Sequence, residues 1–128
     1  MTLKIVETRE APAAIGPYSQ AVQAGGFLFV SGQIGLSPLT GELAGSDLTS
    51  QAEQALENVR QILSAGGFGL SDVVSVEVFL TNVGLFSEFN AVYGRFFSTH
   101  KPARALVEVS ALPRGALVEI KCVAWRAA

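Results

Sequence analysis

The stretch Lys101-Pro102-Ala103-Arg104-Ala105-Leu106-Val107-Glu108-Val109 marks the point where a predicted helix ends and an apolar strand begins. Proline disfavours helical geometry in the residue before it, so the helix cannot continue through this stretch. The following residues alternate as in a strand, which places Ala105, Val107 and Val109 on one face and Arg104, Leu106 and Glu108 on the other. One arginine therefore stands at the junction of the helix and the strand.

Arg104 is the candidate functional centre of this stretch. A guanidinium presents a planar fork of donors that matches a carboxylate with two parallel hydrogen bonds, so an arginine held on a stiff strand suits an acid-bearing ligand. Considered by itself, Arg104 also fits the commoner role of an arginine, at the surface or in a structural ion pair. Further features of the sequence are needed to distinguish a ligand-binding role for Arg104 from a structural one.

The length and composition predict one domain, residues 1–128, that associates with other copies of itself. Hydrophobic residues make up 49% of the chain and charged residues 16%, with a mean hydropathy of +0.39, so polar surface is scarce. Apolar area that one small domain cannot hide is expected to be covered by another subunit. The net charge of −2 and the pI near 5.3, without basic clusters, disfavour nucleic acid as a partner.

The scarcity of cysteine and histidine disfavours metal and disulfide chemistry. Cys122 and His100 are the single residues of their kinds, so neither an internal disulfide nor a multi-histidine metal site can be built. The N-terminal segment MTLKIVETRE lacks the apolar core of a signal sequence, and no segment has the apolar length of a membrane span. These features predict a cytoplasmic protein that does not interact with membranes.

The first half of the chain reads as three strands followed by a helix. Strands are expected at residues 3–7, 19–24 and 27–31, with an irregular loop before Ser19 and a two-residue hairpin turn at Gly25-Gly26. The segment SGQIG at 31–35 is interpreted as a turn that ends the third strand. A helix is predicted over residues 50–65, with a capping box at Ser50 and Glu53 and a stop at Gly66-Gly67.

The second half adds two further strands around a second helix, besides the strand that carries Arg104. Residues 73–80 form a candidate central strand, with Val74, Val76, Val78 and Leu80 on one face. The second helix has an apolar stripe, with Thr81 or Asn82 as its cap, and the stripe comprises Leu85, Phe86, Phe89, Tyr93, Phe96 and Phe97. The final strand spans 117–124 and places Glu119 opposite its apolar set.

The order β-β-β-α-β-α-β-β indicates an α+β domain with both helices on one face of a mixed sheet. The other face of the sheet must then be covered by something outside the domain, which again points to oligomerisation.

Five spaced motifs together resemble the Rid family of reactive intermediate deaminases, also called the YjgF-like family, and in particular its RidA branch. The motifs are AIGPYSQAV (14–22), VSGQIG (30–35), FNAVYGRFF (89–97), PARALVEVSALPRG (102–115) and VEIKCVAW (118–125). The resemblance implies a chorismate-mutase-like fold, a homotrimer, and active sites in clefts between subunits. It also implies hydrolysis of enamines and imines such as 2-aminoacrylate and 2-iminobutyrate to 2-oxo acids and ammonia, with no cofactor.

Position by position, the resemblance assigns roles to six residues. Arg104 is implied to bind the substrate carboxylate, and Glu119 to handle the attacking water. Tyr18, Ser31, Gly32 and Asn90 match positions that line the pocket in the family. A general acid or base at Glu119 and an orienting guanidinium at Arg104 form a coherent set for hydrolysis of a planar imino acid. The Tyr18 hydroxyl could share the proton, or its ring could pack at an interface.

Two residues depart from the pattern of the family. Leu106 stands where Cys or Ala is common, and Lys121 replaces a frequent second glutamate. Because Leu106 lies two residues after Arg104, we expect it to border the space for the carbon chain of the substrate and to favour short imino acids. The alternative is that Leu106 packs against a neighbouring subunit.

Two other functions are compatible with the sequence. A non-enzymatic trimer that binds or senses small carboxylates would use the same Arg104 pocket, although a second anion at Glu119 gives such a binder no advantage. A ribonuclease or translation inhibitor is disfavoured by the acidic pI and the absence of a basic stripe.

Overall fold

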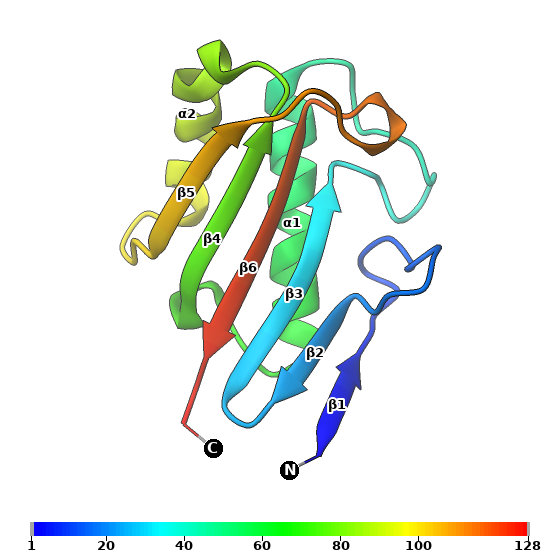
Figure 1. The fold of residues 1–128 in the computed structure, drawn as a ribbon, viewed down its shortest axis with the longest axis vertical. Helices are drawn as coiled ribbons and strands as arrows, with labels where there is room; N and C mark the ends of the chain where they lie inside the picture. Colours follow the sequence, from blue (N-terminus) through cyan, green and yellow to red (C-terminus); the bar gives the residue numbers. More distant parts are fainter. Residues whose placement is uncertain (1, 128) are drawn as a thin grey trace.

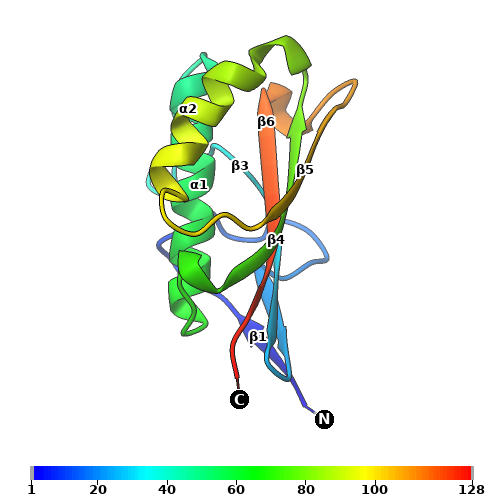
Figure 2. The same cartoon turned by 90° about the vertical axis from the view of Figure 1, so that its left-hand side faces the viewer.

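Six strands form one mixed sheet, and both long helices pack against the same face of it (Figures 1 and 2). This computed structural model describes residues 2–127. The strand order is β1-β2-β3-β6-β4-β5, in which the β4–β5 pair is parallel and the other four neighbouring pairs are antiparallel. The elements are β1 (Leu3–Val6), β2 (Ala21–Ala24), β3 (Phe27–Ile34), α1 (Leu48–Ala65), β4 (Val73–Leu80), α2 (Phe86–Phe96), β5 (Ala103–Glu108) and β6 (Val118–Trp125).

The predicted order of elements and the placement of both helices on one face are confirmed. Between the helices and the sheet lies the hydrophobic core, in which the apolar face of α1 is fully buried. On the sheet side, β6 contributes Val118, Ile120, Cys122 and Ala124, so Glu119 points to the opposite face as expected. A fully buried Leu or Val contributes about 1.5–3 kcal/mol to the free energy of unfolding, so these stripes fix which faces meet.

The helix α1 begins two residues earlier than the sequence predicts. Its cap is Asp47, whose carboxylate accepts a hydrogen bond from the Ser50 amide at 3.3 Å, so the capping box proposed at Ser50 is wrong. The predicted stop is confirmed, because Gly66 ends the helix and Gly67 adopts a φ of +82° that side chains rarely tolerate.

The interpretation of SGQIG as a turn is wrong. The strand β3 continues to Ile34 and pairs with β6 through Gln33↔Ile120 and Ile34↔Glu119, after a register shift between Val30 and Gln33. A β-bulge lets a strand bend and re-aim its side chains without ending the ladder. The bulge contains Ser31 and Gly32, two of the candidate site residues.

The structure also differs from the sequence prediction in smaller details of β4 and α2. A register shift in β4 exposes Val74 and buries Val73 in its place. Before α2, a 3-10 turn (Val83–Leu85) intervenes. Asn82, one of the two predicted caps of the second helix, caps this turn instead, and α2 begins after Leu85 without a side-chain cap. Within α2, Phe86 is exposed and Val92 takes the buried position that the sequence analysis did not assign.

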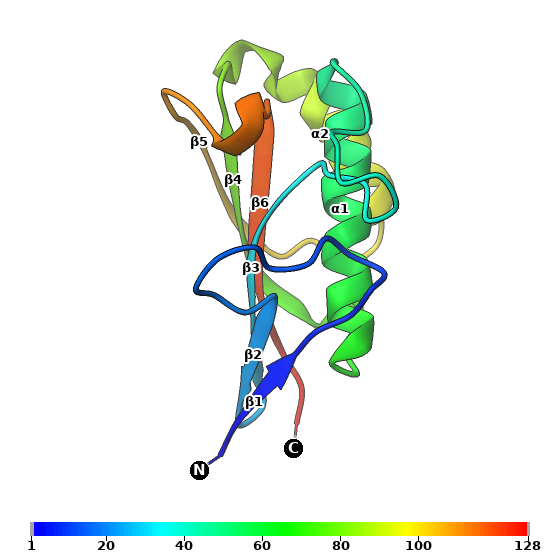
Figure 3. The same ribbon diagram turned by 90° about the vertical axis from the view of Figure 1, so that its right-hand side faces the viewer.

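The helix-free face of the sheet carries large apolar side chains. Phe27, Phe29, Val107 and Trp125 are each between 44% and 49% exposed on strands β3, β5 and β6. Figures 2 and 3 show both helices on the opposite side of the sheet, so these side chains gain no cover from α1 or α2. Within residues 2–127, neither helix combines the length and apolarity needed to cross a membrane.

Candidate active site

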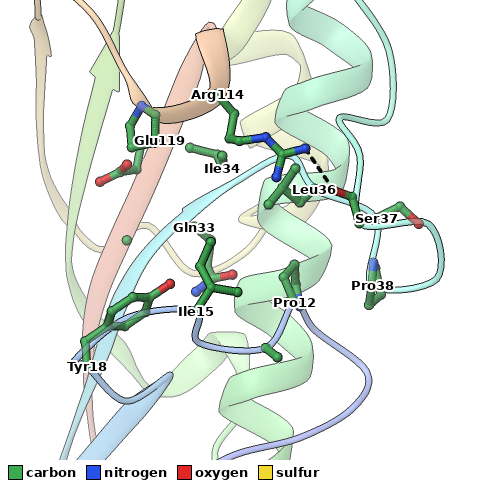
Figure 4. A pocket seen from close by; sticks show the side chains of 14 residues that line it. Pro12, Ile15, Tyr18, Gln33, Ile34, Leu36, Ser37, Pro38, Arg114 and Glu119 are labelled. Carbon is green, nitrogen blue, oxygen red and sulfur yellow. Dashed lines mark hydrogen bonds between the residues drawn. The ribbon is translucent and has the colours of Figure 1, made fainter.

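Glu119 lies in a cleft on the helix-free side of the sheet (Figure 4). The cleft has a volume of about 470 Å³ and is bounded by the loop that carries Tyr18, the β3 bulge and the loop after β3. Most of its wall is apolar, and the titratable side chains that line it are those of Tyr18, Glu119 and Arg114. Further lining residues are Pro12, Ala13, Ile15, Gly32, Gln33, Ile34, Leu36, Ser37, Pro38, Gly41 and Pro113.

The Glu119 carboxylate packs directly against the β3 bulge. A Cβ atom at Gly32 would lie 2.9 Å from Cδ of Glu119, and nearer still to its Oε2, so the absence of a side chain at Gly32 makes room for this carboxylate. Partial burial raises the pKa of Glu119, while the nearby charge of Lys121 acts in the opposite direction. A carboxyl with a raised pKa and an open side is suited to accept and then deliver a proton.

Tyr18 and Ser31 reach the same region from a loop and a strand that are tied together. The buried Gln20 side chain accepts from the Thr8 amide at 2.7 Å and donates to the Pro12 carbonyl at 2.7 Å, which fixes the loop before β2. The Ser31 hydroxyl donates to the Ser19 carbonyl at 2.6 Å. Its proton is therefore engaged, and Ser31 offers a ligand an acceptor rather than a donor.

Arg104 lies on the helix side of the sheet, at the edge strand β5. Its Nη1 donates to Oδ1 of Asn90 at 2.8 Å, and its Cζ lies 4.8 Å from the ring centroid of Tyr93. No carboxylate within residues 2–127 forms an ion pair with this guanidinium. Most of its donors are consequently free for an anionic ligand, and Asn90 is placed to orient the guanidinium.

Leu106 shares the Arg104 face of β5. It is half-buried and packs against the hydrophobic core. Its expected place beside the carbon chain of the substrate stays a prediction.

The structure therefore divides the candidate site residues into two groups on opposite faces of the sheet. Arg104 pairs in register with Val76, whose side chain faces the helices, whereas Glu119 pairs with Phe79 on the other face. Strand β4 also separates β5 from β6, which adds about 10 Å between the two strands. One chain does not bring Arg104 and Glu119 to a common substrate; a second chain would have to supply one of them.

Arg114 is a residue of the cleft that the sequence analysis missed. It stands near the end of the 102–115 motif, where it adopts a φ of 62° and its guanidinium donates to the Gly41 carbonyl at 3.1 Å. This bond ties the turn before β6 to the loop after β3, across the mouth of the cleft (Figure 4). The available signal was a cation directly before a glycine in a turn, which is too common to mark a site.

The described part of the chain contains no group of three or more His, Cys, Asp or Glu side chains that could hold a metal ion. The two groups of candidate site residues contain the carboxyl of Glu119, the phenol of Tyr18 and the guanidinium of Arg104. These groups suit proton transfer and anion binding.

Comparison with known proteins gives matches over nearly the whole chain. A family model described as endoribonuclease L-PSP matches residues 8–126. The chain is 46% identical over 123 residues to a RutC family protein of Pyrococcus horikoshii, covering 96% of this chain and 98% of that protein. It is 45% identical over 121 residues to a Mus musculus protein named 2-iminobutanoate/2-iminopropanoate deaminase, covering 94% of this chain and 90% of that protein.

Among solved structures, E. coli TdcF with bound serine matches with a TM-score of 0.93 and 42% sequence identity. The match covers 97% of this chain and 99% of that chain. The α+β architecture is therefore the same in both proteins.

Proposed function

The chain belongs to the endoribonuclease L-PSP family, also called the YjgF or Rid family, and on that premise we propose that it hydrolyses small 2-imino acids to 2-oxo acids and ammonia. The observation that carries the proposal is that the chain carries both groups that the reaction needs. The Arg104 guanidinium is oriented by Asn90 and forms no ion pair among the described residues, and the Glu119 carboxyl has a raised pKa. The name of the mouse relative supports the same reaction, and the serine-bound relative supports an amino-acid-sized ligand.

The proposed active site lies between two copies of the chain. Because Arg104 and Glu119 occupy opposite faces of one sheet, a shared site needs Arg104 from one subunit and Glu119 from the next. A head-to-tail contact forms a closed ring when its rotation closes, and we propose a ring of three chains, a homotrimer with three sites. The exposed apolar side chains of the helix-free face would be covered by this association.

In the proposed mechanism, Arg104 binds the carboxylate of the imino acid with two parallel hydrogen bonds and fixes the plane of its C2. The substrate enters as the protonated imine. Glu119 takes a proton from water as the water oxygen bonds to C2, and the electron pair of the C=N double bond moves to nitrogen, so the resulting adduct carries OH and NH2 on C2. Glu119 then gives its proton to nitrogen and takes the hydroxyl proton as the C–N bond breaks and the C=O bond forms, which leaves ammonia and the 2-oxo acid. Ammonia finally takes that proton from Glu119 and leaves as ammonium. Tyr18 lines the same cleft as Glu119, which supports a role for its hydroxyl in this proton transfer.

A non-enzymatic carboxylate binder would need only the Arg104 group. The raised pKa of Glu119 and the space that Gly32 leaves for its carboxylate favour the enzyme, because binding an anion gains nothing from a second carboxylate nearby. Ribonuclease action fits the site less well, since the net charge is −2 and the cleft holds one guanidinium beside one carboxylate.

The test is to generate 2-aminoacrylate and 2-iminobutyrate in situ with a pyridoxal-phosphate dehydratase and to follow the release of 2-oxo acid. We expect the protein to accelerate this release, and Arg104→Ala to abolish the acceleration with the fold intact. Arg104→Lys should rescue little, because a point charge cannot replace a bidentate fork. Arg60→Ala is the matched control, since Arg60 also stacks on an aromatic ring at 4.8 Å, on the surface of the helices. Normal acceleration by the Arg104→Ala protein would remove Arg104 from the mechanism.

A further inference from the structure

We infer that Tyr93 is a positioning residue whose ring holds the Arg104 guanidinium in the orientation that a ligand carboxylate requires. The inference deepens the proposed function and rests on it, because it concerns the carboxylate-binding half of the same site. From the sequence, Tyr93 is predicted only to lie in the apolar stripe of α2, and its contact with Arg104 comes from the structure.

The guanidinium is held on two sides by side chains of one helix. Cζ of Arg104 lies 4.8 Å from the ring centroid of Tyr93 and 5.9 Å from that of Phe89, and Asn90 accepts from Nη1 at 2.8 Å. A cation within about 6 Å of a ring centroid is attracted by the electrons of the ring face. Phe89 and Tyr93 are four residues apart, so one face of α2 presents both rings to β5. The rings support the face of the guanidinium, while Asn90 fixes one edge.

This support matters because Arg104 is exposed and has no ionic partner within the described range. A long side chain that is free to rotate must be ordered when a ligand binds, and that loss of rotamer entropy weakens binding. A guanidinium already ordered on an aromatic ring avoids most of this loss. The remaining donors then face outward, where a carboxylate can approach.

The Tyr93 ring is itself held from behind. Its centroid lies 5.5 Å from that of Phe89 and 4.8 Å from that of Phe97, so three aromatic rings form a column along α2. Its hydroxyl is buried and has no hydrogen-bond partner among the described residues. The position of the ring is therefore set by packing, and the hydroxyl contributes nothing to it. Burial also raises the pKa of Tyr93, which keeps the ring neutral beside the guanidinium.

The experiment compares Tyr93→Leu, which removes the ring, with Tyr93→Phe, which removes only the hydroxyl. Phe96→Leu is the matched control, because Arg60 stacks on Phe96 at the same 4.8 Å on the same helix, away from Arg104. For each protein, the dissociation constant for 2-oxobutyrate, KM and kcat for imine hydrolysis, and Tm are measured. We expect Tyr93→Leu to raise the dissociation constant and KM by roughly 3- to 30-fold with a smaller change in kcat. Tyr93→Phe should have the dissociation constant and KM of the wild type. Phe96→Leu should also leave both constants at their wild-type values, with a Tm comparable to that of Tyr93→Leu.

A second measurement needs no ligand and no variant. The Nε–Hε resonance of Arg104 in the free wild-type protein should be shifted by the ring current of Tyr93 and should report an ordered side chain. An averaged resonance without a ring-current shift would overturn the inference, as would a Tyr93→Leu protein that binds 2-oxobutyrate as tightly as the wild type. If the wild type binds 2-oxobutyrate through Arg104 but hydrolyses no imine, the proposed activity fails and the role of Tyr93 stands.

Discussion

Glu119 is the residue on which the distinction between an enzyme and a carboxylate binder depends. We expect Glu119→Gln to slow imine hydrolysis by roughly two to four orders of magnitude, the usual range for a general acid or base. Its affinity for 2-oxobutyrate should stay close to that of the wild type, since Arg104 makes the carboxylate contact. Steady-state kinetics and a separate binding titration measure the two effects. If the glutamine variant instead keeps its rate and loses affinity, Glu119 has a structural role.

The same substitution should change how stability depends on pH. Burial raises the pKa of Glu119 above its ordinary value of 4.5, so at neutral pH its partly desolvated charge opposes folding. Below about pH 4 the group is protonated in both the folded and unfolded states, and this opposition disappears. The Tm of Glu119→Gln should therefore exceed that of the wild type at pH 7, and the difference should shrink as the pH falls toward 4.

Glu77→Gln is the control for this pH dependence, because Glu77 is an exposed residue of β4 on the same face of the sheet. Its Tm difference from the wild type should be small and should not follow the same trend. An equal trend in both variants would mean that the net charge of the protein, and not the burial of Glu119, governs the effect.

At the residue scale, strand alternation predicted the faces of Arg104 and Glu119 correctly, although the register shift in β4 moves Val74 off its predicted face. The side chains of Arg104 and Val107 point to opposite faces of the sheet, and so do those of Glu119 and Ile120, as the sequence indicated. Alternation cannot say how the face of one strand relates to that of another, because that depends on register across β4. The separation of Arg104 and Glu119 by the sheet therefore emerged only from the structure, as did the contact of Tyr93 with Arg104.

At the scale of elements, the β3 bulge positions the Glu119 carboxylate, and the two glycines of the SGQIG segment, Gly32 in the bulge and Gly35 after the strand, should behave differently. A Cβ atom at Gly32 would meet the mobile end of the Glu119 side chain, whereas one at Gly35 would lie 2.7 Å from Cα of Gln51 in α1. We expect Gly32→Ala to displace the carboxylate and reduce kcat with little change in Tm. Gly35→Ala should lower the free energy of unfolding by roughly 1–3 kcal/mol, because backbone cannot yield as a side chain can.

Activity assays and thermal melts of the two alanine variants test this difference. Each variant serves as the control for the other, since both add one methyl group to the same five-residue segment. A Gly32→Ala protein with normal kcat would show that the Glu119 carboxylate works from another position. Equal losses of Tm in both variants would show that a side chain is as costly at Gly32, in the bulge, as at Gly35, against the backbone of α1.

The elements themselves could largely be predicted, and the largest exception, the bulge in β3, has a non-local cause. Helix α1, the hairpin and strand β4 follow from periodicity and turn chemistry, which are local properties. The bulge at Ser31 and Gly32 could not be predicted, because a glycine favours a turn and a bulge equally in the sequence. Pairing with β6 decided in favour of the bulge, and that pairing partner lies about 90 residues away along the chain.

At the scale of the whole molecule, the helix-free face and the divided site point to the same association. The exposed Phe27, Phe29, Val107 and Trp125 side chains lie on the face that contains Glu119. Arg104 lies on the edge strand β5, so the helix-free face of a neighbouring copy can approach it from outside the sheet. A ring of three chains would thus cover apolar surface and complete three sites by one repeated contact. Inactive variants of the two half-sites should therefore complement each other.

We expect a mixture of Arg104→Ala and Glu119→Gln proteins, each inactive alone, to recover activity after co-expression or after joint unfolding and refolding. In a mixed trimer, a site that takes Arg104 from a Glu119→Gln chain and Glu119 from an Arg104→Ala chain has both functional groups intact. Random equal mixing should place this combination at one site in four, so recovery should approach roughly a quarter of the wild-type rate. Native mass spectrometry establishes that mixed trimers form, and mixing Arg104→Ala with the double variant is the control, because no site then combines both groups. Mixed trimers that form without regaining activity would show that Arg104 and Glu119 do not act on one substrate, and a chain that stays monomeric at micromolar concentration would contradict the shared site itself.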